Sequence, residues 1–240
     1  MLFLNRIINL KIKTIRESLK LLRDCITYGV NQDNNIKKLK ELYKGLGYVT
    51  LFVYWRCFHT PYSDLEKLIP KKGKILDLGC GYGLFSNLLA LTSLNREVVG
   101  CDICKRKLKY SNRNLKGVKF VLSDAFQLVA SEKFDVIVMN HLLHHLQSYE
   151  SQDRLLKLCY EALKEGGYLL ILEIDKRPYL KFLFTQLVDN VAYFGDKFYY
   201  RDNQEFKILL ENLGFKKIKI YPAYKKSLLS HVIISAQKLN

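Results

Sequence analysis

The sequence predicts an α/β protein built on a doubly wound, mostly parallel sheet. Three observations favour this fold class. Short apolar segments alternate with helical patterns along residues 74–236, a glycine-rich turn follows the first apolar segment, and polar residues stand where successive strands end. The chain has 240 residues, 49% of them hydrophobic, which is enough for one such domain and an appendage.

The segment 74–86, KILDLGCGYGLFS, predicts a buried strand, a turn and the start of a helix. Asp77 interrupts the apolar strand. Three glycines follow it at alternate positions: Gly79, Gly81 and Gly83. A glycine permits positive φ and lets a ligand approach the backbone. The third glycine comes one residue too early for the dinucleotide fingerprint G-x-G-x-x-G, so this turn predicts a different nucleotide ligand.

The pattern D-x-G-x-G-x-G resembles motif I of the class I methyltransferases that depend on S-adenosyl-L-methionine (SAM). The resemblance covers residues 70–240 and implies a Rossmann-like, seven-stranded methyltransferase fold with SAM as cofactor. It implies that Asp77 and the glycine turn, with Cys80, hold the methionine end of SAM.

A second predicted strand, 98–101, ends at Asp102, which lies 19 residues beyond Gly83. This spacing suits an acid that binds ribose hydroxyls, as in the resembled family. Ile103 follows it and is expected at the same cofactor. The alternative is that Asp102 caps a helix over 104–114. A lone C-x-x-C at this corner lacks a second cysteine pair, so we predict no metal there.

The third predicted strand, 118–122, leads to Asp124 and Ala125, which the resemblance places at the adenine. The alternative for Asp124 is an acid on a surface turn. The fourth predicted strand, 134–139, ends at Asn140, which we also expect at the cofactor.

Three of the five histidines follow Asn140: His141, His144 and His145. Histidine has a pKa suited to removing a proton from a methyl acceptor. His145 is the first candidate for such a base and His144 the second, and the alternative is a packing role for both. A metal site is disfavoured because no carboxylate is near in sequence. The fifth predicted strand, 168–172, ends at Glu173, which is expected to orient the acceptor or the base.

The remaining segments complete the predicted domain. A helix over 154–163 stops at the glycines of 165–167, and a capping box at Asp202 and Glu205 starts a helix that runs to 213. Segments 215–221 and 232–236 read as a terminal antiparallel pair. The apolar insertion 176–202 is expected to cap the acceptor pocket, with core cover or a dimer face as alternatives.

Residues 1–69 are predicted to form a helical extension. Within it, 2–22 read as a basic amphipathic helix that packs on its own domain or closes the pocket, with peripheral membrane contact as the alternative. A helix of about ten residues is expected from Ile36, and a short one over 62–68. The aromatic segment 48–58 is expected in the core, or else lining the acceptor pocket.

The chain carries a net charge of +16, which favours polyanionic partners such as nucleic acid or an anionic membrane, unless it only reflects a lysine-rich proteome. Its six cysteines form no disulfide framework, and no apolar run approaches the roughly 18 residues of a membrane span, so we expect a cytoplasmic protein. The fourth strand end lacks the N/D-P-P-Y and Pro-Cys motifs of nucleic-acid methyltransferases, which weakens the nucleic-acid interpretation without excluding it.

The expected function is methyl transfer from SAM to a small or lipid-like acceptor through oxygen, nitrogen or activated carbon. An RNA or protein methyltransferase that uses the basic surface is a second interpretation. A binding or membrane-associated module with a SAM-like pocket and no turnover is a third. The sequence leaves the oligomeric state open.

Overall fold

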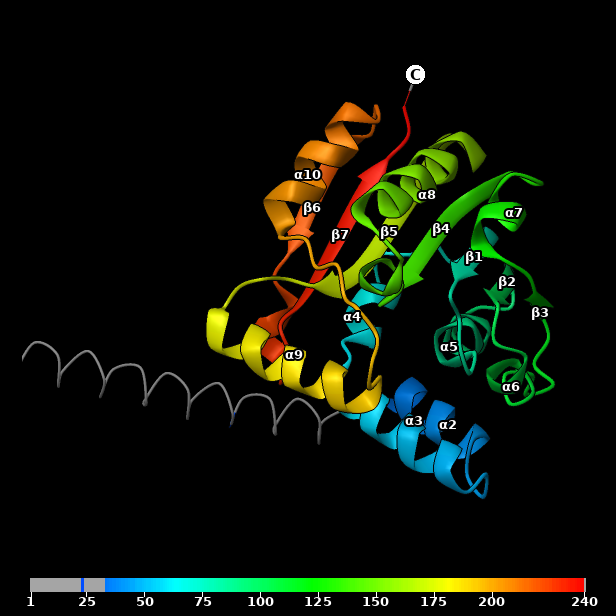
Figure 1. Cartoon of the computed structure of the whole chain (residues 1–240). Coiled ribbons are helices and arrows are strands. Elements are labelled where there is room, and N and C mark those ends of the chain that lie inside the picture. Colours follow the sequence, from blue (N-terminus) through cyan, green and yellow to red (C-terminus); the bar gives the residue numbers. More distant parts are fainter. Residues whose placement is uncertain (1–22, 24–32, 240) are drawn as a thin grey trace, which may run out of the picture.

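A computed structural model describes Arg23 and residues 33–239 of the chain (Figure 1). A seven-stranded sheet of order β3-β2-β1-β4-β5-β7-β6 forms its centre, as the sequence predicts. The strands are β1 (Gly73–Leu78), β2 (Arg96–Asp102), β3 (Val118–Leu122), β4 (Phe134–Asn140), β5 (Leu163–Ile174), β6 (Lys216–Tyr221) and β7 (His231–Gln237).

Strands β1 to β5 are parallel, and β7 pairs antiparallel with both β5 and β6. The register aligns the ends of the central strands, because Leu78 of β1 lies opposite both Cys101 of β2 and Met139 of β4. Asn140 of β4 lies opposite Leu172 of β5. The polar residues that follow these strands are therefore gathered at one edge of the sheet.

Alternate residues of each strand face opposite layers of helices. On β1, Leu76 and Leu78 pack against α7 (Ala125–Val129), α8 (Tyr149–Ala162) and α10 (Asn203–Asn212). Ile75 packs on the other face, against α2 (Asn34–Leu42), α3 (Tyr48–His59), α4 (Tyr62–Glu66) and α5 (Leu84–Thr92). Figure 1 shows α8 and α10 on one side of the sheet and α2, α3 and α5 on the other.

The described part of the predicted N-terminal extension packs into the same hydrophobic core as the sheet. Ile36 and Leu39 of α2 are buried in the cluster that contains Leu88 and Leu89 of α5. Tyr43 is buried there as well, and its hydroxyl donates a hydrogen bond of 2.7 Å to the carbonyl of Tyr82. The prediction for residues 2–22 lies outside the described residues.

Three predicted boundaries are wrong. The helix expected over 104–114 is only α6 (Lys105–Leu108). The chain turns soon afterwards, where Asn114 adopts a φ of 57° and its backbone N–H donates to the side chain of Asn112. Helix α8 begins at Tyr149 rather than at 154 because the side chain of Ser148 caps it. Strand β5 is longer than expected and begins at Leu163, ahead of the glycines.

The insertion 176–202 contains a helix, α9 (Tyr179–Ala192), which Figure 1 shows beside α3 at the edge where β4 and β5 end. The capping box predicted for α10 is present, because Asp202 accepts from the backbone of Glu205 and the Glu205 side chain accepts from the backbone of Asp202. Among the described residues, no helix is both long and apolar enough to cross a bilayer.

Candidate active site

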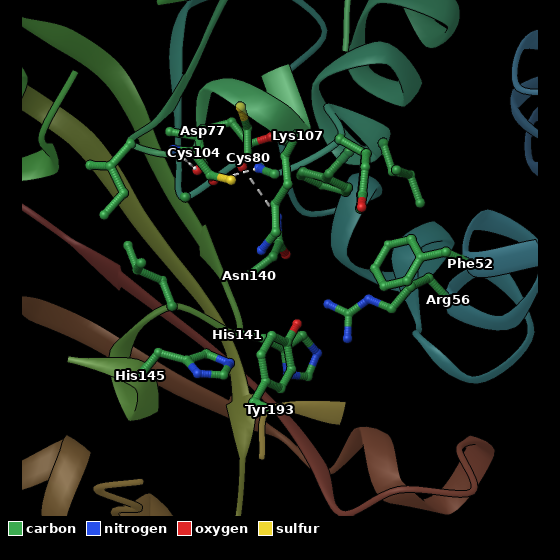
Figure 2. Close-up of a pocket in the computed structure, with 18 of the residues that line it drawn as sticks. Phe52, Arg56, Asp77, Cys80, Cys104, Lys107, Asn140, His141, His145 and Tyr193 are labelled. Atoms are coloured by element: carbon green, nitrogen blue, oxygen red, sulfur yellow. Dashed lines mark hydrogen bonds between the residues drawn. The ribbon is translucent and has the colours of Figure 1, made fainter. Parts of the chain in front are cut away.

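A cavity of about 390 Å³ opens at the carboxyl ends of β1, β2 and β4 (Figure 2). Its walls include the glycine turn after β1, Asp102 and Asn140 at the ends of β2 and β4, and side chains from α3 and from the end of α9. Figure 2 shows Asp77, Cys80 and Cys104 on one side of the cavity and His141, His145 and Tyr193 on the other. The cavity therefore spans the predicted cofactor residues and the predicted base candidates.

The glycine turn is held close to its neighbours. Gly79 and Gly83 have φ values of 69° and 74°, which side chains rarely adopt. A Cβ on Gly79 would lie 2.8 Å from the Leu142 side chain, and one on Gly83 would lie 2.7 Å from the ring of Phe120. The turn therefore requires glycine at both positions for conformation and for space.

Asp102 links the turn to the second strand. Its Oδ2 accepts a hydrogen bond of 2.8 Å from the backbone N–H of Gly81, and its Oδ1 accepts one of 2.7 Å from Cys104. The expected capping role is thus present in part, since Cys104 is the residue that precedes α6. A carboxylate offers about four lone-pair sites, so Asp102 retains capacity for ribose hydroxyls. Ile103, 72% exposed, borders the cavity beside it.

Asp77 lines the cavity and is 1% exposed. Burial raises its pKa to about 7, against the opposing effect of a 2.6 Å hydrogen bond from Ser86 Oγ. Asn140 Nδ2 lies 3.4 Å from the same carboxyl, and Asn140 Oδ1 is buried with no hydrogen-bond partner. An ammonium or sulfonium group fits here, since it would stabilise the Asp77 carboxylate and an ammonium would donate to the orphaned oxygen.

Asp124 and Ala125 lie outside the residues that line this cavity. Asp124 is exposed and caps α7, accepting a hydrogen bond of 2.7 Å from the backbone of Phe126. The preceding residue, Ser123, donates its backbone N–H to the carbonyl of Asp102, which keeps this corner next to the end of β2. Adenine binding by Asp124 and Ala125 stays a prediction.

His144 and Glu173 form a buried pair beside the cavity. His144 Nδ1 lies 2.5 Å from Glu173 Oε2, and Glu173 Oε1 accepts from the backbone N–H of Leu143 at 2.7 Å. Burial acts to lower the pKa of His144, but the charge and hydrogen bond of Glu173 outweigh it and raise that pKa above 6.5. Glu173 itself does not line the cavity, whereas His144 does.

His145 also lines the cavity. Its ring centroid lies 4.3 Å from that of His144 and 4.6 Å from that of Tyr193. Its pKa is lowered to about 3, first by burial and then by the positive charge of His144, Lys107 and Arg56. His145 is therefore neutral at pH 7 and is a weaker base than His144.

All five histidines of the chain form one continuous array. Ring centroids lie 5.6 Å apart for His59 and His231, 4.8 Å for His231 and His141, and 6.0 Å for His141 and His144. No carboxylate is near these histidines in the sequence, which disfavours a metal site, yet the fold brings Glu173 to His141 and His144, with ligand atoms within 4.8 Å of one another. Both Glu173 oxygens already accept hydrogen bonds, so this carboxylate is satisfied without an ion.

Several residues that line the cavity were missed or left undecided by the sequence. Phe52 and Arg56 reach it from α3, so the aromatic segment contributes to the pocket as well as to the core. Their spacing of four residues on one helix face was the available signal. Tyr193 and Asp189 reach it from the insertion 176–202, and closure of an acceptor pocket by this insertion stays a prediction. Lys107 and Tyr62 were not expected there.

The sequence matches a protein-family model described as a methyltransferase domain over residues 55–220. Among curated proteins it is similar to an uncharacterised protein of Methanocaldococcus jannaschii, 27% identical over 65% of this chain and 72% of that protein. It is 30% identical to a demethylmenaquinone methyltransferase of Thermotoga maritima and 29% identical to a ubiquinone biosynthesis O-methyltransferase of Cereibacter sphaeroides. These two alignments cover 42% and 48% of this chain and 43% and 47% of those proteins, so the chain spans less than half the length of each.

Solved structures of similar fold include a SAM-dependent methyltransferase from Archaeoglobus fulgidus, with a TM-score of 0.59 and 24% identity over 74% of this chain and 92% of that one. Human N-acetylserotonin methyltransferase, solved in complex with SAM, has a TM-score of 0.63 and 16% identity over 83% of this chain and 58% of that one. At these identities the likeness concerns the fold.

Proposed function

Because the chain belongs to the methyltransferase domain family, we propose that it transfers a methyl group from SAM to a small or lipid-like acceptor, at an oxygen atom. The observation that carries this proposal is the single cavity that joins Asp77, the glycine turn and Asp102 to His144 and His145. The relatives named as O-methyltransferases of ubiquinone biosynthesis support oxygen as the methylated atom and a quinone-like acceptor.

The cofactor would occupy the end of the cavity that borders the glycine turn. Asp77 and the Asn140 side chain would hold the ammonium of its methionine portion, and Asp102 the ribose hydroxyls. SAM supplies an electrophilic methyl group when bound. The chain's own contribution is to hold the acceptor in line with that methyl in a site from which water is excluded.

We propose His144 as the general base, oriented by Glu173. A hydroxyl acceptor must lose a proton as its oxygen forms the new bond to carbon, and His144 Nε2 would take that proton while Nδ1–H remains bonded to the carboxylate. The raised pKa of His144 makes it a better proton acceptor near neutral pH than His145. This reverses the order in which the sequence ranked the two histidines.

An exposed apolar face on α9 supports delivery of the acceptor from a lipid surface. Five of its large apolar side chains recur at helical spacing and are 40–74% exposed: Leu180, Leu183, Phe184, Leu187 and Val191. The same helix supplies Asp189 to the cavity wall. Together with the net charge of +16, this face favours contact with an anionic bilayer.

Vesicle flotation tests this contact. The chain is expected to float with vesicles that contain phosphatidylglycerol, and a Leu183→Glu, Leu187→Glu variant is expected to stay at the bottom of the gradient. Ile208→Glu is the matched control, because Ile208 is a 57% exposed apolar residue on α10. Equal flotation of all three proteins would contradict the proposed contact between α9 and the bilayer.

Transfer of a radiolabelled methyl group from SAM tests the function. Purified protein is incubated with an extract that contains membranes, and the products are separated into organic and aqueous phases. Label in the organic phase that depends on Asp102 supports a lipid-like acceptor. Label only in nuclease- or protease-sensitive material would instead favour methylation of a macromolecule. If no label is transferred at all, the result would favour a binding module without turnover.

A further inference from the structure

Arg56 extends a positive charge into the cavity from the last turn of α3. Figure 2 shows its guanidinium pointing from that helix into the pocket, toward the side where Asn140, His141 and Tyr193 lie. The side chain is half-buried, and the cavity wall around it includes Phe52, which lies one helical turn earlier. A guanidinium in such a position is costly to desolvate unless an anion or several acceptors satisfy it.

The neighbours of Arg56 satisfy it only in part. Burial acts most strongly to lower the pKa of Arg56, but the nearby Tyr62, Tyr193 and Asp189 outweigh it and raise that pKa. Within the part of the chain that the structure describes, no carboxylate oxygen lies within 4.0 Å of its nitrogens. Asp189, the acid whose charge acts on the pKa of Arg56, accepts instead from the Tyr200 hydroxyl at 2.8 Å. Most of the five N–H donors of Arg56 therefore remain available to a ligand.

The charge of Arg56 acts at the histidine end of the cavity. It contributes to the lowered pKa of His141 and His145, and it opposes the raised pKa of His144. By contrast, besides burial, the groups that mainly set the pKa of Asp77 are Ser86, Asn140 and Asp102, and Arg56 is not among them. This agrees with Figure 2, in which the guanidinium points to the side of the cavity where His141 and Tyr193 lie.

We propose that Arg56 binds a carboxylate on the methyl acceptor, so that the acceptor is an aromatic acid whose hydroxyl is methylated. This inference rests on the proposed methyltransferase function. Arginine binds carboxylates through two parallel hydrogen bonds, which fixes direction as well as position. With the carboxylate on Arg56 of α3 and the base His144 after β4, an aromatic ring between them would hold its hydroxyl toward His144. Phe52 and Tyr193 supply flat apolar surface for such a ring.

Binding of a matched pair of probes tests the proposal. We would titrate 3,4-dihydroxybenzoate and its uncharged methyl ester into the protein saturated with S-adenosylhomocysteine. The acid is expected to bind at least about tenfold more tightly than the ester, as a charge-assisted bidentate pair provides. In Arg56→Gln the two probes are expected to bind equally, whereas Arg56→Lys should restore part of the preference.

Two controls separate Arg56 from general effects. Arg154→Gln removes one positive charge from the exposed face of α8, and it should keep the preference of the wild-type chain. Thermal unfolding of Arg56→Gln reports whether the variant is folded, and Arg56→Lys supplies a second measurement if it is not. If the wild-type chain does not bind the acid more tightly than the ester, the proposal is overturned.

The cofactor carries a carboxylate of its own, so a second arm compares S-adenosylhomocysteine with 5′-methylthioadenosine, which lacks the amino acid group. Arg56→Gln is expected to leave the affinity for both unchanged. A loss of about tenfold for S-adenosylhomocysteine alone would assign Arg56 to the cofactor and overturn an acceptor role. Failure of the wild-type chain to bind either nucleoside would instead contradict the proposed function itself.

Discussion

His144 Nδ1 lies 2.5 Å from Glu173 Oε2 although the two residues are 29 positions apart in the sequence. The parallel pairing of β4 with β5 brings them together, because it places Asn140 opposite Leu172 and so aligns the two strand ends. The pair is buried, and its carboxylate also accepts from the backbone of Leu143. The imidazole is therefore held in one orientation beside the cavity.

Glu173→Gln should reduce turnover by about 10- to 100-fold, less than the roughly 100- to 10,000-fold contribution of a general base, because Glu173 acts through His144. Loss of the carboxylate removes the interaction that raises the pKa of His144, so burial then lowers that pKa. The acidic limb of the rate profile should move to lower pH while the maximum rate falls. Steady-state kinetics across pH measure both effects, and an unmoved limb would contradict a role for Glu173 in orienting the base.

The same pair predicts how stability depends on pH. The pKa of His144 is raised in the folded chain, so its contribution is complete below the unfolded value near 6.5 and is lost as pH rises through the folded pKa. The difference in melting temperature between wild type and Glu173→Gln should thus be larger at about pH 5.5 than at about pH 9. Differential scanning calorimetry at the two pH values measures it, and a constant difference would argue against the ion pair.

Asp102→Ala should weaken S-adenosylhomocysteine binding by about 100-fold or more, since it removes the ribose acceptor together with the hydrogen bond that holds the backbone of Gly81. Titration calorimetry measures the affinity. Asp124→Ala is the informative comparison, because Asp124 is exposed and outside the cavity lining. A large loss in Asp124→Ala as well would support its predicted contact with adenine, and full affinity in Asp102→Ala would contradict the cofactor site.

Cofactor binding should release a proton from Asp77. Burial raises the pKa of this carboxyl to about 7, and a bound ammonium favours its ionised form, so affinity should increase with pH between about 6 and 8. Calorimetric titrations in two buffers of different ionisation enthalpy count the protons released. Asp77→Asn should release none, and equal heats in both buffers for the wild type would show that Asp77 does not respond to the ligand.

Gly83→Ala should destabilise the fold by about 2–4 kcal/mol through unfavourable φ and steric overlap together. A Cβ at this position meets the Phe120 ring at 2.7 Å and the Ser111 side chain at 2.8 Å. Gly166→Ala is the control for φ alone, because Gly166 has a φ of 77° and nothing lies within 4 Å of its Cβ position; it should cost about 1 kcal/mol. Urea unfolding measures both, and equal costs would exclude the steric term.

Local sequence signals were sufficient where a function depends on neighbouring residues. Asp77 and the glycines that follow are a contiguous strand, turn and helix start, so their arrangement could be predicted from spacing and from the conformational freedom of glycine. Asp102 could be predicted because parallel strands end at one edge of the sheet. The start of the helix expected at 154 was less predictable, since the single polar side chain of Ser148 decides where α8 begins.

The sequence by itself determined the fold class, the glycine turn and the order of strand ends, because these depend on residue patterns within a few positions of one another. Only the tertiary structure decided which histidine is paired with Glu173, that all five histidines form one array, and that Arg56 and Tyr193 line the same cavity. Such relationships join segments far apart in the chain. They arise from strand register and from the packing of α3 and α9 at the sheet edge, which local periodicity does not contain.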